Sequence, residues 1–271
     1  MFLIFTDLDG SLLDQADYSY EGARPALDRI AHEGWPLVFV TSKTRSEVEA
    51  LQRRMDVEGP FVVENGAAVF FPASLIGLDI PVIPDASSDG SVRALVFGRL
   101  YSEVRRFMEN VRGDFGLRGF GDMELREIAE LTDLPPEDAE RARAREFTEP
   151  FIMADPERLP ELEAAAAARG FAITTGGRLY HLMGAGQNKG RAVRKVQEIL
   201  AGSERNPVVS LGLGDSPNDA EMLEVVDHAI VIPRPDGSVM EVPRDDVVVA
   251  PEPGSRGWSS ALLDVVSRLT S

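Results

Sequence analysis

Short apolar segments alternate with helical segments at both ends of the chain, and this alternation limits the fold more than any other feature. Residues 2–5, 36–40 and 61–63 are apolar runs of strand length. Residues 21–33 and 46–55, which lie between them, carry apolar side chains at helical spacing. Strands that alternate with helices form right-handed βαβ units and a parallel sheet. We therefore predict a Rossmann-like, doubly wound α/β core.

The same alternation returns after residue 186. Apolar strands and helices follow one another to the C-terminus, with helices predicted over residues 189–200, 220–226 and 258–269, and strands over residues 208–213, 229–232 and 247–250. Two separated stretches of one pattern predict a discontinuous core, built from residues 1–85 and 187–271.

The middle of the chain has a different pattern. It predicts a strand over residues 92–98, helices over 101–111 and 157–169, a charged helical stretch over 123–147 that is broken at Pro135-Pro136, and a hairpin over 171–183. This order does not continue the βαβ alternation. We predict a smaller α+β domain, residues 86–186, inserted into the core.

Composition excludes several classes of protein. The 271 residues carry 28 basic and 45 acidic side chains, for a net charge of −17. Such a surface repels nucleic acid and anionic membranes. Cysteine is absent, which excludes disulfides and thiolate sites, and three scattered histidines argue against a histidine-rich metal centre. The apolar N-terminal run is too short for a signal peptide and no segment is long enough for a membrane span, so we predict a cytoplasmic protein.

Two acidic clusters follow two of the predicted buried strands. Asp7 and Asp9 come directly after residues 2–5, and Asp215 and Asp219 follow residues 208–213. The carboxyl ends of parallel strands are where open α/β sheets bind ligands. Oxygen ligands of this kind suit Mg²⁺, with Asp219 placed to orient the site. One such cluster alone could equally be a helix-capping turn, but two clusters on separate strands weaken that alternative.

Hydroxyl groups and lysines complete the set of polar candidates. Thr41 and Ser42 end the second strand at a predicted helix start, which suits an anion, although such residues are more often simple helix caps. Lysine occurs only at Lys43, Lys189 and Lys195. Lys43 adjoins the hydroxyls and Lys189 begins the helix on which the core resumes, so both can hold a phosphate, whereas Lys195 is better explained as a solvated charge.

In their order and spacing, the polar candidates resemble the four motifs of the haloacid-dehalogenase phosphatase superfamily: Asp7 and Asp9, Thr41, Lys189, and Asp215 with Asp219. The inserted domain resembles the C2-type cap of that superfamily. The first motif usually has threonine where this chain has Ser11, a conservative change.

The resemblance implies a chemical role for each motif. Asp7 would be the nucleophile that forms an aspartyl-phosphate, and Asp9 the general acid and base. Mg²⁺ would be held by Asp7, the backbone carbonyl of Asp9, and Asp215. Thr41 and Lys189 would hold the phosphoryl oxygens.

Five further segments narrow the resemblance to the mannosyl-3-phosphoglycerate phosphatases: residues 40–48, 60–66, 127–132, 143–151 and 176–181. That family implies hydrolysis of mannosyl-3-phosphoglycerate to mannosylglycerate and phosphate, the second step of a compatible-solute synthesis. The substrate would be a phosphorylated glycosyl-glycerate. An alternative function is hydrolysis of the glucosyl analogue. A further alternative is the activity of another sugar-phosphate phosphatase or of a phosphomutase of the same superfamily.

The cap must then recognise a carboxylate and a sugar. The candidates for these contacts are Ser42, Lys43, Arg145, Arg178 and His181, with Glu64, Asn65 and Glu146 for the hydroxyls. A solvated helical charge explains Arg145 equally well, and a packed strand residue explains His181.

Two other classes of protein share part of this pattern. A signalling receiver also uses aspartates, a hydroxyl and a lysine, but it is about half this length and has no inserted domain. A catalytically silent sugar-phosphate sensor would not need Asp7, Asp9 and Lys189 together.

Overall fold

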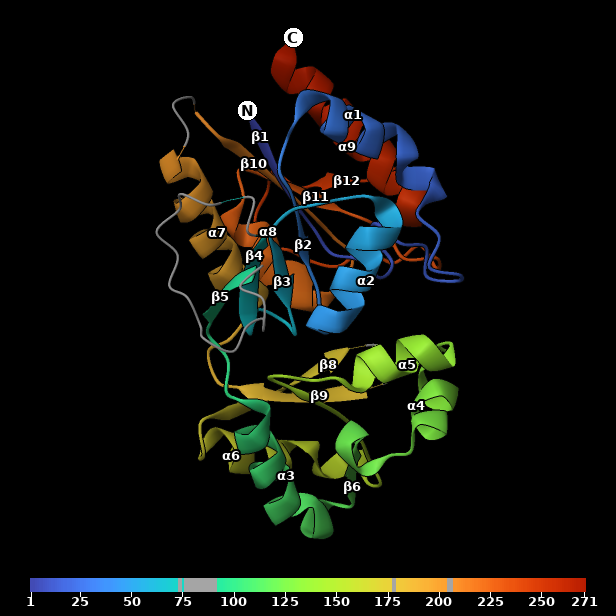
Figure 1. Cartoon of the computed structure of the whole chain (residues 1–271), viewed down its shortest axis with the longest axis vertical. Helices are drawn as coiled ribbons and strands as arrows, with labels where there is room; N and C mark the ends of the chain where they lie inside the picture. Colours follow the sequence, from blue (N-terminus) through green and yellow to red (C-terminus); the bar gives the residue numbers. More distant parts are fainter. Residues whose placement is uncertain (73–74, 76–91, 177–178, 204–206) are drawn as a thin grey trace.

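The computed structural model describes residues 1–72, 75, 92–176, 179–203 and 207–271. These residues form two bodies, one above the other in Figure 1, each built around its own sheet. Both chain termini lie on the larger body, at the end away from the smaller one (Figure 1).

The larger body contains an eight-stranded sheet. Its strands lie in the order β12 (Val248–Val249), β11 (His228–Val231), β10 (Val209–Gly214), β1 (Phe2–Thr6), β2 (Leu37–Val40), β3 (Phe61–Val63), β4 (Ala68–Pro72) and β5 (Val92–Val96). Neighbours from β12 to β3 are parallel, and β4 and β5 extend the sheet in antiparallel pairs. The predicted α/β core with a mostly parallel sheet is confirmed.

Helices cover both faces of this sheet. One face carries η1 (Glu21–Ala23), α1 (Arg24–Glu33), α2 (Arg45–Met55) and α9 (Gly254–Thr270), and the other carries α7 (Lys189–Ser203) and α8 (Ala220–Val225), preceded by η5 (Pro217–Asp219) (Figure 1). Side chains of β1 point alternately to the two faces of the sheet. Phe2 and Ile4 pack in the hydrophobic cluster on one face, and Leu3 and Phe5 pack in the cluster on the other face. A strand buried on both faces is apolar throughout, which explains its unbroken sequence.

The smaller body, called the cap below, contains an antiparallel sheet in the order β6 (Leu117–Gly119), β7 (Glu149–Met153), β9 (Leu179–Gly184) and β8 (Phe171–Gly176). Its helical segments are α3 (Tyr101–Phe115), η3 (Phe120–Asp122), α4 (Leu125–Thr132), α5 (Pro136–Arg143), η4 (Pro156–Arg158) and α6 (Leu159–Ala167). Side chains of α3 and α6 pack with Phe151, Phe171 and Leu182 of the sheet. Residues of α4 and α5 form a separate cluster around Ile128.

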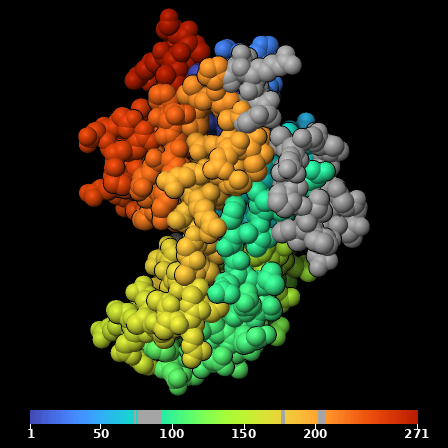
Figure 2. All heavy atoms as spheres, turned by 90° about the vertical axis from the view of Figure 1, so that its left-hand side faces the viewer, coloured from blue at the N-terminus to red at the C-terminus, as the bar shows by residue number. Residues whose placement is uncertain are grey.

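The first connection between the two bodies differs from the prediction. The sequence pattern places the strand predicted over residues 92–98 in the inserted domain that begins at residue 86, and this placement is wrong. Val92–Val96 instead belongs to the core sheet, because β5 pairs with β4 along its whole length. Residues 85 and 86, the predicted boundary, lie outside the described residues. The chain returns to the core between β9 and α7, and Figure 2 shows the two connections side by side at the waist of the molecule.

Local sequence signals account for several element ends. The predicted break at Pro135-Pro136 separates α4 from α5, which begins at Pro136, a position that tolerates proline because its N–H would have no partner in the helix. The predicted hairpin is formed by β8 and β9. The sequence interpretation missed β4, β6 and β7. No helix in the described part of the chain has the length and apolar character that crossing a membrane requires.

Candidate active site

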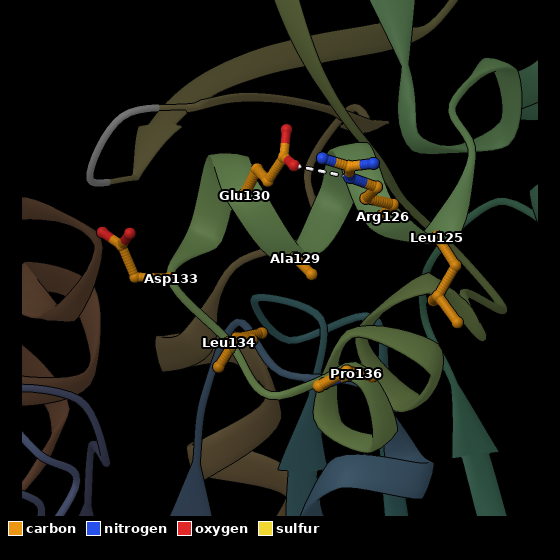
Figure 3. A pocket seen from close by; sticks show the side chains of 7 residues that line it. All are labelled: Leu125, Arg126, Ala129, Glu130, Asp133, Leu134 and Pro136. Carbon is orange, nitrogen blue, oxygen red and sulfur yellow. Dashed lines mark hydrogen bonds and ion pairs between the residues drawn. The ribbon is translucent and has the colours of Figure 1, made fainter.

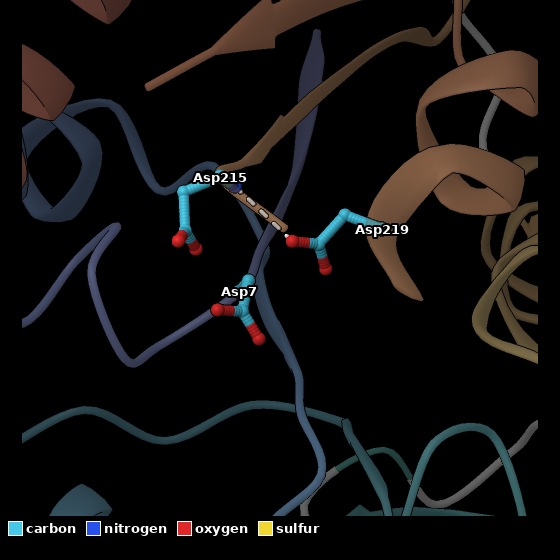
Figure 4. A group of neighbouring side chains, drawn as sticks. All are labelled: Asp7, Asp215 and Asp219. Atoms are coloured by element: carbon cyan, nitrogen blue, oxygen red, sulfur yellow. Dashed lines mark hydrogen bonds between the residues drawn. The ribbon is translucent and has the colours of Figure 1, made fainter. Parts of the chain in front are cut away.

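The two acidic clusters meet at the carboxyl edge of the core sheet. Strands β1 and β10 are parallel neighbours, and Thr6 is opposite Leu213 in their register. Asp7 therefore leaves the sheet beside the turn that carries Asp215. Figure 4 shows the carboxylates of Asp7, Asp215 and Asp219 turned toward one another from segments about two hundred residues apart. This edge of the sheet faces the cap (Figure 1).

The three carboxylates form a compact, buried group. One oxygen from each of Asp7, Asp215 and Asp219 lies within 4.8 Å of the others, and all three residues are buried. Lys189, the first residue of α7, places its Nζ 2.6 Å from Asp7 Oδ1 and 2.6 Å from Asp219 Oδ1. One ammonium thus faces three acidic groups, which leaves an excess of negative charge.

The pKa values of these groups reflect that imbalance. Burial, and then repulsion by Asp219, raises the pKa of Asp7 well above its usual value, although Lys189 opposes the shift. The same causes raise the pKa of Asp215 to about 6. Burial disfavours the charge on Lys189, but the attraction of Asp219 and Asp7 outweighs it and raises the lysine pKa. A cation near Asp7 and Asp215 would relieve this repulsion.

Asp219 has a different set of partners from the other two aspartates. Its Oδ2 accepts hydrogen bonds from the backbone N–H groups of Asp215 and Ser216, at 3.1 and 3.0 Å, and its Oδ1 accepts from Lys189. Both oxygens are therefore used to hold the Asp215 turn and the lysine. Asp219 is placed to orient the site, while Asp7 and Asp215 offer the oxygens that suit a hard divalent cation.

Two neighbours of Asp215 were not among the predicted site residues. Ser11 Oγ donates to Asp215 Oδ1 at 3.2 Å. Gly10 has a φ of +82°, and a Cβ at this position would lie 2.9 Å from Asp215 Oδ2. The aspartate-glycine-serine sequence after β1 carried this signal, because a glycine and a hydroxyl there let the two acidic turns come into contact.

The Asp9 carboxylate lies apart from this acidic group. Its Oδ2 is 2.8 Å from Lys43 Nζ, and 41% of its side chain is exposed, against 8% for Asp7. The Lys43 ammonium also lies 5.2 Å from the ring centroid of Tyr18. Within the described residues, Asp9 does not supply a carboxylate oxygen to the cluster that could hold a metal. The contact through its backbone carbonyl stays a prediction.

Thr41 lies at the same edge, directly after β2. It is buried, and its Oγ1 accepts a hydrogen bond from the Lys43 N–H at 3.2 Å. The Ser42 carbonyl accepts a bond from Arg145 Nη1 at 2.8 Å. The segment of residues 41–43 is therefore held from both sides, by its own threonine and by an arginine of the cap.

The cap presents polar side chains toward the core. Leu182 of β9 packs with α3 and α6, so the adjacent His181 points to the opposite face of the cap sheet. His181 is buried, and its Nδ1 has no hydrogen-bond partner among the described residues. Burial, and then the charge of Arg145, lowers its pKa to about 3, so the imidazole is neutral. Burial also raises the pKa of Glu146.

The remaining predicted contacts lie at the junction of the two bodies or outside the described residues. Glu64 is fully buried, and its carboxylate accepts hydrogen bonds from the cap. Asn65 Oδ1 accepts from Asn218 Nδ2 at 3.0 Å, which connects it to the Asp215–Asp219 turn. Arg178 lies outside the described residues.

A separate pocket lies between α4 and α5, and none of the predicted site residues lines it. Figure 3 shows its lining side chains, Leu125, Arg126, Ala129, Glu130, Asp133, Leu134 and Pro136. This pocket lacks the converging carboxylates and the lysine found at the carboxyl edge of the core sheet. The carboxyl edge of the sheet is therefore the candidate active site.

A family model and several known proteins match this chain. A family model described as haloacid dehalogenase-like hydrolase matches residues 4–76 and 124–241. The chain is 45% identical, over 98% of both chains, to a glucosyl-3-phosphoglycerate/mannosyl-3-phosphoglycerate phosphatase of Persephonella marina. It is 36% identical to a protein of the same name from Methanococcoides burtonii, over 98% of this chain and 97% of that protein. A solved structure, protein 0175 of Thermoplasma acidophilum, shares the fold with a TM-score of 0.68 and 20% identity, over 97% of both chains.

Proposed function

The chain belongs to the haloacid dehalogenase-like hydrolases, and on this premise we propose that it is a phosphoric monoester hydrolase that converts mannosyl-3-phosphoglycerate into mannosylglycerate and phosphate. The observation that carries this proposal is the buried group of Asp7, Asp215 and Asp219 with Lys189 at the carboxyl edge of the sheet. The substrate is supported by the names of the two relatives that align over nearly the whole chain.

Asp7 would attack the phosphorus atom. Lys189 donates to Asp7 Oδ1, which orients the carboxylate and leaves Oδ2 as the attacking oxygen. Formation of an aspartyl-phosphate breaks the bond to the glycerate oxygen, and water then hydrolyses the acyl phosphate, so one difficult step becomes two easier ones. Thr41 and Lys189 would hold phosphoryl oxygens at the same edge.

Asp9 would move the protons. Its carboxylate is more exposed than those of Asp7, Asp215 and Asp219, the acidic triad, and is separate from them. Asp9 can therefore protonate the departing glycerate oxygen and later accept a proton from water. Lys43 is its ion-pair partner, and the glycerate carboxylate is a second anion that this ammonium can bind. We therefore propose Lys43 as the contact to the carboxylate group of the substrate.

Asp7 and Asp215 would hold a magnesium ion, with Asp219 fixing their arrangement and the Asp9 carbonyl as a further ligand. Three acidic groups against one ammonium fit a divalent cation. When bound, the ion would neutralise negative charge on the phosphate.

The sugar would be recognised from the cap. His181 offers a neutral imidazole with an unpartnered Nδ1, and Arg145 bridges the cap to residues 41–43. We propose these two residues, with Ser42, Asn65, Glu146 and Arg178, as the surroundings of the sugar and the glycerate.

Glucosyl-3-phosphoglycerate is the second candidate substrate. One observation favours it: the names of both full-length relatives include the glucosyl and the mannosyl compounds. A pocket that accepts both sugars tolerates a change of configuration at one hydroxyl, which requires few direct contacts at that position.

Phosphate release from a panel of substrates tests the proposal. The purified protein with Mg²⁺ is incubated with both glycosyl-3-phosphoglycerates, sucrose 6-phosphate and mannose 1-phosphate. We expect the highest kcat/KM with a glycosyl-3-phosphoglycerate, loss of activity with EDTA and its return with Mg²⁺. Conversion of mannose 1-phosphate to its isomer without phosphate release would identify a mutase, and binding without turnover would identify a sensor.

A further inference from the structure

We propose that Glu64 is a positioning residue that fastens the cap to the core, and that this fastening selects for large substrates; the selectivity rests on the function proposed above. Glu64 directly follows β3, at the same sheet edge as Asp7. Its side chain is entirely buried. The sequence alone suggested contact with a sugar hydroxyl, but the structure gives its carboxylate a different set of partners.

Four donors of the cap converge on this one carboxylate. The N–H of Glu146 bonds Oε1 at 2.9 Å, the N–H groups of Phe147 and Thr148 bond Oε2 at 3.2 and 2.7 Å, and the Thr148 hydroxyl bonds Oε2 at 2.7 Å. These residues lead directly into β7, the strand beside β9 in the cap sheet. An ionised carboxylate only accepts hydrogen bonds, so it matches a set made entirely of donors.

The backbone of Glu64 holds two further segments. Its N–H donates to the Lys43 carbonyl at 3.0 Å, and its carbonyl accepts from Gln187 Nε2 at 2.9 Å. Gln187 Oε1 in turn accepts from the N–H of Gly184, the last residue of β9. One residue of the core thus contacts the start of β7, the return connection from the cap, and the segment that carries Lys43.

Local strain supports a specific role for this turn. Glu64 and Asn65 adopt φ values of +49° and +59°, and Gly66 follows with +88°. Non-glycine residues adopt this left-handed conformation where the surrounding structure compensates its cost, and they gather at functional sites. Here the turn aims the Glu64 carboxylate at the cap while Asn65 contacts Asn218 beside the catalytic turn. The strained turn of residues 64–66 therefore contacts both the cap, through Glu64, and the turn that carries Asp215 and Asp219, through Asn65.

The fastening predicts a difference between large and small substrates. A glycosyl-3-phosphoglycerate needs the cap contacts of Arg145 and His181, whereas p-nitrophenyl phosphate needs only the sheet edge. Loosening the cap would therefore raise KM for the glycosyl substrate and leave turnover of the aryl phosphate nearly unchanged. Damage to the triad itself would lower both.

Glu64→Gln is the sharpest variant, because it keeps the shape but turns an amide N–H₂ toward donors. We expect a loss of kcat/KM of about tenfold or more for the glycosyl substrate, mainly in KM, and less than about threefold for p-nitrophenyl phosphate. Glu163→Gln makes the same chemical change at an exposed site on α6 and should match the wild type. Thr148→Val removes one of the four donors and should show a smaller effect in the same direction, which keeps the test valid if Glu64→Gln folds poorly.

Hydrogen exchange separates this inference from the substrate assignment. We expect the amides of residues 146–148 to exchange at least about tenfold faster in Glu64→Gln, with β1 unchanged, whatever substrate the enzyme prefers. Unchanged protection of these amides, or equal losses with both substrates, would overturn the proposal. Failure of the wild type to hydrolyse either glycosyl-3-phosphoglycerate would instead refute the function proposed above. The hydrogen-exchange result would still show whether Glu64 holds the cap on the core.

Discussion

The single carboxylate of Glu64 and the acidic triad are both buried at the same edge of the core sheet, but their surroundings differ. Glu64 is saturated, because four donors of the cap reach its two oxygens. The Lys189 ammonium pairs with Asp7 and Asp219, and together with Asp215 these three carboxylates carry an excess of negative charge. A buried carboxylate whose oxygens are filled by hydrogen-bond donors serves the structure, whereas three buried carboxylates with a single ammonium indicate a missing positive charge.

The pKa values of Glu64 and Asp7 are both raised, but the causes that accompany burial differ between them. Burial raises the pKa of Glu64, but Arg145 and the hydrogen bonds from the cap all oppose the shift. Burial also raises the pKa of Asp7, and there Asp219, Asp215 and Asp9 add to it, with only Lys189 opposing. The neighbours of Glu64 therefore favour its charge against the effect of burial, whereas most neighbours of Asp7 add to the effect of burial, which favours binding of a cation in addition to Lys189.

Replacing the nucleophile gives the largest expected effect. Asp7→Asn removes the attacking oxygen, so we expect phosphate release to fall by at least about 10⁴-fold. The fold should persist, because loss of one negative charge relieves repulsion in the triad, and the metal-free melting temperature should not fall. Initial rates and circular dichroism check both statements. Phosphate release at the wild-type rate would show that Asp7 is not the nucleophile and that the acidic triad takes no part in the chemistry.

Asp9→Asn should have the next largest effect. The variant keeps the nucleophile but cannot transfer protons, and we expect a loss of about 10²–10⁴-fold in kcat. Asp28→Asn, on the exposed side of α1, makes the same change away from the site and serves as the control. Acid quenching during turnover would reveal phosphoenzyme, since nucleophilic attack remains possible. Rates equal to those of the control would show that another group moves the proton.

The core and its acidic group were predictable from sequence for a physical reason. Strands buried on both faces are mainly apolar, so β1 and β2 stand out, and β10 follows the same pattern apart from Ser210 and its glycines. The parallel order then brings their carboxyl ends together. The aspartates that follow β1 and β10 consequently meet without any knowledge of side-chain geometry. Lys189 was identified because lysine is rare in this chain.

The cap and the junction were less predictable, because their partners are distant in sequence and polar. Strand β7 begins with Glu149, a buried acid paired with Arg105 at 2.8 Å, so its sequence lacks an apolar period. The sequence pattern places strand β5 in the wrong body, because nothing in residues 92–96 identifies β4 as its partner. The role of Glu64 depends on backbone N–H groups more than eighty residues away, which have no signature in the side chains.

Substitution of Arg145 tests the contribution of the cap to substrate binding, and we expect a moderate effect. Its Nη1 donates to the Ser42 carbonyl and its Nε to the Ala142 carbonyl, a pair of bonds that a lysine cannot reproduce. For Arg145→Lys we expect KM for the glycosyl substrate to rise about tenfold while kcat changes little. Arg143→Lys, at the exposed end of α5, is the matched control. A fall in kcat without a change in KM would instead connect Arg145 to the phosphate chemistry of the sheet edge.

The smallest expected effect is a pH-dependent gain in stability from Mg²⁺. Asp215 has a pKa of about 6 in the folded protein, above its ordinary value, so its stabilising contribution is complete at low pH and is lost as the pH rises through 6. We therefore expect the metal-free melting temperature to fall between pH 5 and 7, and Mg²⁺ to raise it by a few degrees at pH 7 but hardly at pH 5, where the proton competes with the ion. Thermal melts with Mg²⁺ or EDTA measure this, and Asp215→Asn should weaken the pH dependence of the Mg²⁺ effect, leaving the part that comes from Asp7. An equal gain at both pH values would mean that the cation binds where no carboxylate titrates, and the excess negative charge of the acidic triad would then need another explanation.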